Sequence, residues 1–461
     1  MKFISTVTVL LAVFFMALPL QAQDTLQVSL NDFIQRGMQN SGQIDYQEQN
    51  ISLAENKVDQ AQAQRVLPKL DLSTQHGVVP GVRSNTNLKE TAYYLDPNLE
   101  NDWDNWAVFT RAEVNAVQPI FTWGAINNAI NAAQSAAKAA REQFESQKAD
   151  MQIRLYDLYQ SYVLTLEVNR LLEEAKNEIE KIEKQIDESR ESGDSEVDES
   201  DVFKFKIFKS EFEIRAAEVK ENSKFIQSVW NYVLQAEEGQ VFEPATRFLD
   251  PIQNPIEELD YYRISAVQAR PEVKAIEAGV NAAEYGIEAT QAQRYPSLFL
   301  GLTGKFAKTP NRPRQSNPFI INNSNFLSAG FGLSIRQNLN FWQITQDVDR
   351  SRIKHKQAKY LKEAAVDGIV LEINEKYKNA SLSKVKVEKT DEALVTGKQW
   401  LRQEQLDYDF GIGEIKDLLD AMKKELELRV QLKQRIFDFN KDMAELYRAS
   451  GLEITTLKMT N

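Results

Sequence analysis

The sequence predicts a mainly α-helical protein that also contributes strands to a transmembrane β-barrel. Three observations support this fold class: two very long helical segments, four short segments in which apolar and polar side chains alternate, and a duplication that relates the two halves of the chain. Together they predict long antiparallel helical hairpins with four strands per chain and an internal repeat.

The N-terminal residues 1–22 have the features of a secretory signal peptide. Lys2 supplies a positive start, Val7–Leu20 an apolar core, and Ala22 a small residue at the cleavage point. After this segment, no apolar run reaches the roughly 18 residues that a membrane-spanning helix needs. We therefore expect the mature chain to leave the cytoplasm without a helix that holds it in the inner membrane.

Charge and composition narrow the classes of function. The formal net charge is −12, which argues against nucleic acid as a partner. The chain has no cysteine, so disulfides and cysteine-based metal sites are excluded, and the two histidines, His76 and His355, lie in unrelated contexts. The sequence offers no nucleophile–base pairing, metal-ligand spacing or nucleotide-binding motif. We expect the protein not to be an enzyme and to carry no cofactor and no metal ion.

The first part of the mature chain is predicted as a helix followed by two strands. Leu30–Val66 has the apolar spacing of a helix, which stops before Pro68. The segments near 69–78 and 108–118 alternate with a period of two, as half-buried strands do. Between them, residues 83–104 form a polar segment with several aromatic residues. These aromatics resemble the girdle at the end of a membrane strand, and a loop with its own small core explains them equally well.

The alternation gives each strand two different faces. In the second strand, Val108 and Val114 face one way, whereas Arg111 and Glu113 face the other. Charged residues on one face suit a wet lumen, and small apolar residues on the other face suit lipid.

Two helical segments are much longer than a globular domain requires. Phe121–Arg190 and Phe341–Asp407 each span about 70 residues, which corresponds to about 100 Å of helix, while helices in globular proteins average about 11 residues. Such lengths are typical of a coiled coil or the wall of a tube. Each helix is followed by a turn, near Gly193 and Gly411. The return helices are predicted over 202–235 and 417–448.

The pattern of the first half starts again in the second half. Gln62–Arg65 recurs as Gln291–Arg294, Pro68 has a counterpart in Pro296, and Gln118 corresponds to Gln337. A repeat of over 200 residues indicates a duplication rather than a solenoid.

This duplication divides the chain into two structural repeats. We expect the first repeat over 23–238, a proline-containing equatorial linker over 239–265, and the second repeat over 266–461. The second repeat supplies strands near 297–306 and 327–337.

Strands of this kind require partner chains. Open sheet edges would leave backbone groups unpaired in lipid, and closed single-chain barrels begin at about eight strands. Four strands per chain therefore predict an oligomer that closes the wall, although this argument does not decide between three copies and two.

Two carboxylates, Asp417 and Asp420, follow the second turn. On a helix, residues three apart lie on the same face. Two interpretations are open: a hairpin tip that presents acid to a pore or partner, or acids that stabilise a helix N-terminus through its dipole.

These features together resemble the TolC-like outer membrane efflux protein family. The resemblance covers nearly all of the mature chain. It rests on the signal peptide, the duplicated halves, Pro68 and Pro296 before strands, Gln118–Phe121 before the long helix, and the arrangement of Gly411, Ile415, Asp417, Asp420 and Ala421.

The resemblance implies a homotrimer with a twelve-stranded barrel in the outer membrane and a long α-helical barrel in the periplasm. It implies a passive exit duct of a tripartite efflux or type I secretion system, fed by a periplasmic adaptor protein and an inner-membrane pump. It also places Asp417 and Asp420 at the pore constriction, where three copies would form a negative ring that attracts cations. The residues implied at the adaptor-contacting tips are Ser192, Gly193, Asp194, Phe410, Gly411 and Ile412.

One departure and one alternative remain. The acidic run around Ser192–Asp194 departs from the family pattern, so the class of adaptor stays open. The alternative function is a soluble periplasmic coiled-coil scaffold, which would explain the long helices and the signal peptide but not four alternating strands with apolar faces.

Overall fold

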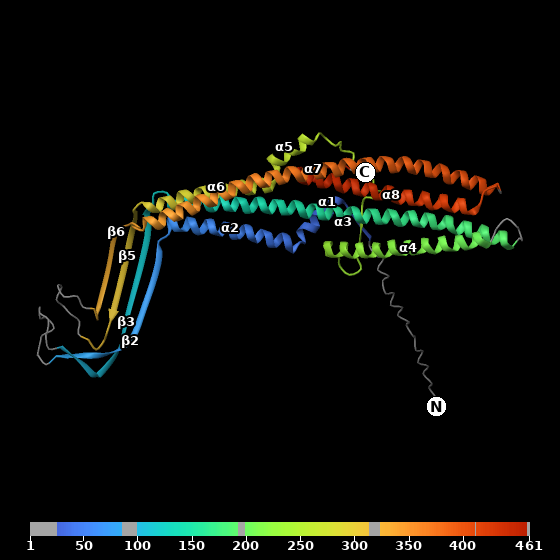
Figure 1. Cartoon of the computed structure of the whole chain (residues 1–461). Helices are drawn as coiled ribbons and strands as arrows, with labels where there is room; N and C mark the ends of the chain where they lie inside the picture. The colour runs from blue at the N-terminus through green and yellow to red at the C-terminus, as the bar shows by residue number, and fades with distance from the viewer. Residues whose placement is uncertain (1–24, 85–98, 192–198, 313–322, 411, 459–461) are drawn as a thin grey trace, which may run out of the picture. The chain divides into compact units, whose positions relative to one another are not determined.

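The computed structural model describes residues 25–84, 99–191, 199–312, 323–410 and 412–458 (Figure 1). The predicted signal peptide, residues 1–22, lies outside the described residues. No helix within the described ranges combines the length and the apolar character needed to cross a membrane.

The chain folds into two compact units. The first, which we call the hairpin unit, comprises the described residues of Met1–Asp45, Gln147–Ala269 and Ile369–Asn461. The second, which we call the sheet unit, comprises the described residues of Tyr46–Ser146 and Arg270–Gly368. The helices are α1 (Leu30–Gln39), α2 (Gly42–Val66), α3 (Ala125–Glu191), α4 (Glu199–Leu234), α5 (Leu259–Ala269), α6 (Pro271–Gln291), α7 (Phe341–Asp409) and α8 (Ile415–Ala449).

The sheet unit contains an antiparallel sheet of four strands. Its strands are β2 (Lys69–Ser84), β3 (Leu99–Phe121), β5 (Ser297–Lys308) and β6 (Phe326–Arg336). They lie side by side in the order β2-β3-β5-β6, so β2 and β6 are the edges of the described sheet (Figure 1). The strand segments predicted from alternation are confirmed.

The register of this sheet joins the apolar faces of the strands into one surface. Leu70 pairs with Ala116, Ala116 with Leu302, and Leu302 with Phe331, so one apolar row crosses the sheet. The exposed fraction is 68% for Leu70, 49% for Leu302 and 84% for Phe331. In a single chain this apolar face is therefore largely uncovered.

The opposite face of the sheet is polar. Ser73 pairs with Glu113, Glu113 with Lys305, and Lys305 with Ser328. The Lys305 ammonium lies 3.1 Å from the Glu113 carboxylate. Because this row lies three residues, an odd number, from the apolar row on each strand, the two rows are on opposite faces, and the two faces predicted from the sequence are confirmed.

The sheet extends beyond the predicted strands. β3 begins at Leu99, inside the polar segment for which the end of a membrane strand and a loop were both open, and β2 continues to Ser84 after a register shift at Pro80/Gly81. Trp103 and Trp106 therefore lie on a strand, with their ring centroids 5.9 Å apart, and both are mostly exposed. Backbone pairing past the bulge, rather than local composition, determines where these strands start and end.

The internal duplication has a structural counterpart in a repeated hydrogen bond. The Gln118 side-chain amide donates to the carbonyl of Arg65 at 2.8 Å, and the Gln337 amide donates to the carbonyl of Arg294 at 3.3 Å. Both arginines end the repeated Gln-Ala-Gln-Arg motif. The same contact thus holds the chain before β2 and before β5.

Two regions of the chain differ from the prediction. The expected helix over Leu30–Val66 is broken into α1 and α2 at Asn40, the C-cap residue of α1, whose side-chain amide donates to the carbonyl of Val233 at 3.1 Å. The region 239–265 contains β4 (Val241–Pro244), which pairs in parallel with β1 (Thr25–Val28), a pair that the sequence did not reveal.

An aromatic core holds these elements together. The Phe33 ring of α1 stacks on Trp230 of α4 at 4.2 Å, and Trp230 also contacts Tyr159 and Tyr162 of α3. All four side chains are at most 2% exposed, so α1 is anchored between α3 and α4.

Candidate functional site at the hairpin tips

The turn between α7 and α8 is closed by one backbone carbonyl. The carbonyl of Asp407 accepts the N–H of Ile412 at 3.0 Å and the N–H of Gly413 at 2.9 Å. Phe410 and Ile412 point outward, with 76% and 77% of their surface exposed. The turn therefore presents apolar side chains to its surroundings while its backbone is fixed.

Gly413 is a requirement of this turn that the sequence analysis missed. A Cβ atom at this position would lie 2.8 Å from the backbone nitrogen of Tyr408 and 2.9 Å from the carbonyl carbon of Asp407. Backbone atoms cannot move aside as a flexible side chain can, so only glycine fits. The available signal was the second glycine of Gly411-Ile412-Gly413.

The first turns of α8 bury one side of the helix against α3 and α4. Ile415, Leu418, Leu419 and Met422 are all at most 6% exposed. They belong to one apolar cluster whose other buried members are Leu172, Ile179, Ile182, Ile186, Val202, Phe205 and Phe212. The ends of both helical hairpins thus share a single core.

Asp417 and Asp420 lie on the exposed side of α8, away from this core. The Asp417 N–H donates to the carbonyl of Glu414 at 3.1 Å, which places Asp417 in the first turn, where an acid stabilises the helix dipole. Asp420 lies one turn further on. Stabilisation of the helix N-terminus therefore explains Asp417 but not Asp420.

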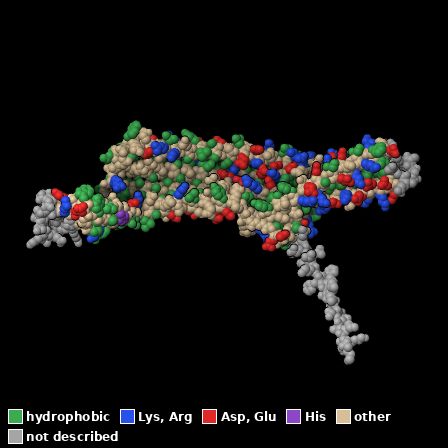
Figure 2. All heavy atoms as spheres, turned by 90° about the horizontal axis from the view of Figure 1, so that it is seen from below, with side chains coloured by type: hydrophobic (Ala, Val, Ile, Leu, Met, Phe, Trp, Pro, Cys, Tyr) green, Lys and Arg blue, Asp and Glu red, His purple; other side chains and the backbone are tan. Residues whose placement is uncertain are grey.

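The surface around these aspartates carries both signs of charge. Asp420 lines a groove between α4 and α8 together with Lys204, Glu211 and Lys423. The Lys423 ammonium lies 3.2 Å from the Glu211 carboxylate. Acidic and basic side chains are likewise interspersed over this end of the hairpin unit in Figure 2. Within one chain, the face with Asp417 and Asp420 is therefore mixed in charge rather than uniformly acidic.

Ser192, Gly193 and Asp194 lie between α3 and α4, and they and Gly411 lie outside the described residues. The described tip residues among the predicted set are Phe410 and Ile412.

Above the tips, a ladder of ion pairs joins α3 to α8, with the acids on α3 and the bases on α8. The named rungs are Asp150–Arg448 (2.7 Å), Asp157–Lys441 (3.3 Å), Glu167–Lys433 (2.9 Å) and Glu174–Arg429 (3.3 Å). Burial raises the pKa of Asp157, and the Lys441 ammonium opposes this shift. The sequence analysis missed these pairs, because nothing local indicates which acid meets which base.

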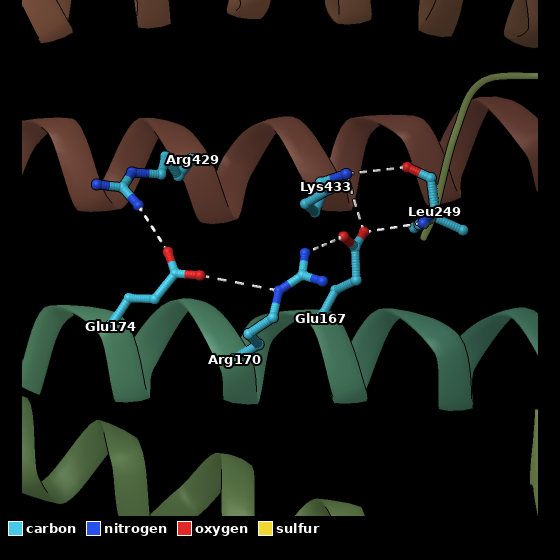
Figure 3. A network of polar contacts seen from close by, with 6 residues as sticks. All are labelled: Glu167, Arg170, Glu174, Leu249, Arg429 and Lys433. Carbon is cyan, nitrogen blue, oxygen red and sulfur yellow. Dashed lines mark hydrogen bonds and ion pairs between the residues drawn. The ribbon is translucent and has the colours of Figure 1, made fainter. Parts of the chain in front are cut away.

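The Glu167 rung, drawn in Figure 3 beside the Glu174–Arg429 rung, is the most buried of the four. The side chain of Glu167 is 1% exposed. Its carboxylate accepts from the Arg170 guanidinium at 2.8 Å, the Lys433 ammonium at 2.9 Å and the backbone N–H of Leu249 at 2.9 Å. Lys433 also donates to the carbonyl of Leu249 at 3.1 Å. The buried charge is thus fully surrounded by donors.

Comparison with known proteins identifies a family and a fold. The family model described as "Outer membrane efflux protein" matches residues 33–201 and 264–452. No curated protein matches the chain.

Solved outer membrane channels share the architecture. The Campylobacter jejuni CmeC outer membrane channel has a TM-score of 0.72 at 15% identity, over 92% of this chain and 86% of that chain. The open state of the Neisseria gonorrhoeae MtrE outer membrane channel has a TM-score of 0.69 at 13% identity, over 92% and 89%. The outer membrane protein VceC from Vibrio cholerae has a TM-score of 0.65 at 16% identity, over 92% and 96%. These likenesses confirm the predicted fold class.

Proposed function

The chain belongs to the outer membrane efflux protein family and is therefore an outer-membrane exit duct for efflux, and we propose that it works as a homotrimer. In this proposal, a periplasmic adaptor protein and an inner-membrane pump feed the duct, as in a tripartite efflux or type I secretion system. The family comprises channels rather than enzymes, and the soluble scaffold is not favoured. The two repeats would cover 23–238 and 266–461, with 239–265 between them.

One observation carries the oligomer, and the resemblance to the family supplies the number three: the sheet has a continuous apolar face and two edges without a partner in the described chain. In lipid, the backbone groups of β2 and β6 would remain unpaired unless another copy supplied the next strand. If β6 of one copy pairs with β2 of the next, a head-to-tail contact closes into a ring. Three copies supply twelve strands, which exceeds the roughly eight at which closed barrels begin.

In such a ring the polar face lines the lumen. The Glu113–Lys305 ion pair lies on this face, so its charges would be solvated within the duct rather than placed in lipid. The proposed mechanism is passive conduction, with the energy supplied by the pump, since the chain carries no nucleotide-binding motif.

We place the pore constriction at Asp417 and Asp420. Both side chains are exposed on the side of α8 opposite the core, which supports this role. Stabilisation of the helix N-terminus accounts for Asp417 alone, so Asp420 is left for another role such as this one. Because Lys423 and Glu211 lie beside Asp420, the selectivity of the ring for cations would be moderate rather than strong.

The adaptor would contact the hairpin tips. The proposed contact residues are Ser192, Gly193, Asp194, Phe410, Gly411 and Ile412. The exposed apolar side chains of Phe410 and Ile412 support this placement, because a protein partner can cover them.

Conductance in planar bilayers tests the constriction. The double variant Asp417→Asn/Asp420→Asn should lower cation selectivity and weaken blockade by divalent cations. Glu427→Gln is the matched control, because it removes one carboxylate from α8 about two turns beyond Asp420. Unchanged selectivity in the double variant would rule out the constriction. The trimer has a separate test: light scattering of the protein in gentle detergent should give the mass of three chains, and the mass of one chain would contradict it.

A further inference from the structure

We propose that Glu167 is a positioning residue that sets the axial register of α8 against α3, and thereby the height of Asp417 and Asp420 along the helical wall. The functional consequence rests on the proposed constriction, whereas the register itself can be measured separately. The inference is built from the ion-pair ladder, the burial of one rung and the contacts of the segment around Leu249.

The ladder fits only one register of the two helices. If α8 slipped by one turn so that Arg429 faced Glu167, Glu425 would come opposite Glu174. If α8 slipped by one turn in the other direction, Glu445 would come opposite Asp157. Each slip loses most of the rungs and creates a repulsive pair, so the order of charges specifies the alignment.

The Glu167 rung contributes most to fixing the register of the two helices, because the Glu167 carboxylate is buried away from water. The acids of the other rungs remain 24% to 54% exposed, so water could solvate them after a slip. At 1% exposure, Glu167 depends on its protein donors, and an uncompensated buried charge is strongly unfavourable. Of the two slips, only the one that brings Arg429 opposite Glu167 keeps a cation of α8 against the buried carboxylate, and it loses the Lys433 contact with Leu249 and sets Glu425 against Glu174.

A third segment ties this rung to the rest of the hairpin unit. The backbone of Leu249 both donates to Glu167 and accepts from Lys433, so its peptide groups close a ring with the ion pair (Figure 3). Nearby, the fully buried Asn440 of α8 accepts the N–H of Ile252 and donates to the carbonyl of Asp250, both at 2.9 Å. The segment around residues 249–252 thus holds α8 at two points.

Closer to the tips, the contact between α3 and α8 changes character. Ile179 and Ile182 meet Leu418, Leu419 and Met422 in an apolar cluster. Apolar contacts tolerate repacking more readily than a buried ion pair does, so they specify register less sharply. Lys433 follows Asp420 by 13 residues, or about 20 Å of helix, so a shift at Glu167 would be carried rigidly to the constriction.

A distance measurement tests the register. Because the chain has no cysteine, spin labels can be attached at Asn177→Cys on α3 and Lys424→Cys on α8, with labelled chains diluted into unlabelled ones. Both positions are exposed. In Glu167→Gln, we expect a broader distribution or a second population displaced by about one helical turn, roughly 5.4 Å. The control Glu174→Gln removes an exposed rung and should leave the distribution unchanged.

A second variant separates register from stability. Replacing both buried partners, as in Glu167→Met/Lys433→Met, should leave a folded protein, because apolar replacement of a buried ion pair is often neutral or better. We expect this variant to be folded yet to show the broadened distribution. A wild-type distribution in both Glu167 variants would overturn the inference.

Conductance then distinguishes the inference from the proposed function. If the distances shift in Glu167→Gln and cation blockade changes as in Asp417→Asn/Asp420→Asn, both hold. If the distances shift while neither variant changes blockade, the positioning role stands and the constriction fails.

Discussion

Replacing Gly413 by alanine perturbs the α7–α8 turn at the one described tip position where the backbone approaches itself most closely. The new Cβ atom would meet the Tyr408 nitrogen at 2.8 Å and the Asp407 carbonyl carbon at 2.9 Å, distances that real Cβ contacts do not show. The turn must therefore open, and the two hydrogen bonds that Ile412 and Gly413 donate to the Asp407 carbonyl are lost or weakened.

The size of the effect follows from these two bonds. Each contributes about 0.5–1.5 kcal/mol net, so the local cost is about 1–3 kcal/mol. Since every 1.4 kcal/mol or so corresponds to a tenfold change in an equilibrium constant, the open form of the turn should become about 5- to 150-fold more populated. Because the cost is local, the apolar cluster under α8 should stay intact.

Hydrogen exchange measured by mass spectrometry on the purified protein provides the assay. Amides of the turn should exchange faster in Gly413→Ala by about this factor, while those of α8 beyond Met422 remain protected. Gly368→Ala is the matched control, because a Cβ there meets nothing within 4 Å and alanine stabilises a helix interior by about 0.5–1 kcal/mol. Wild-type exchange in the turn of Gly413→Ala would refute the reasoning.

Two further predictions concern the helical hairpins. Burial raises the pKa of Asp157 above its ordinary value of about 4, despite the Lys441 partner. The folded state therefore favours the protonated carboxyl. The stability that this protonation contributes is fully present below about pH 4 and is lost as the pH rises through the raised pKa. The melting temperature of the wild type relative to Asp157→Asn should therefore fall over this window, and a pH-independent difference would contradict the assignment. Asn440→Ala should lower stability by about 1–3 kcal/mol for each backbone group that it leaves unpaired, those of Ile252 and Asp250. Thermal unfolding checks this, and a wild-type midpoint would show that these groups find other partners.

The parts of the fold that follow a local period could be predicted from the sequence. Strict alternation located the strands and both of their faces, because successive side chains in a strand point to opposite sides. Likewise, the three-residue spacing of Asp417 and Asp420 placed both on the exposed side of α8, while Leu418 and Leu419 between them are buried.

Features that depend on distant contacts could not be predicted. The parallel pairing of β1 with β4 involves four residues on each strand, too few for a periodic signal. The need for glycine at position 413 arises from the path of the backbone around Asp407. Similarly, Glu167 is one acid among many on a charged helix, and only packing reveals that it is buried against Lys433. The last two of these features act on the α7–α8 turn and on the packing of α8.

The central claim is that the apolar face of the four-stranded sheet looks into lipid, which makes neighbouring copies necessary. Fluorophores at Phe331→Cys and Gly330→Cys, adjacent positions on opposite faces of β6, can be exposed to lipids that carry a quencher in their acyl chains. The account predicts strong quenching at position 331 and little at position 330. Quenching at position 330 with protection at position 331 would contradict it.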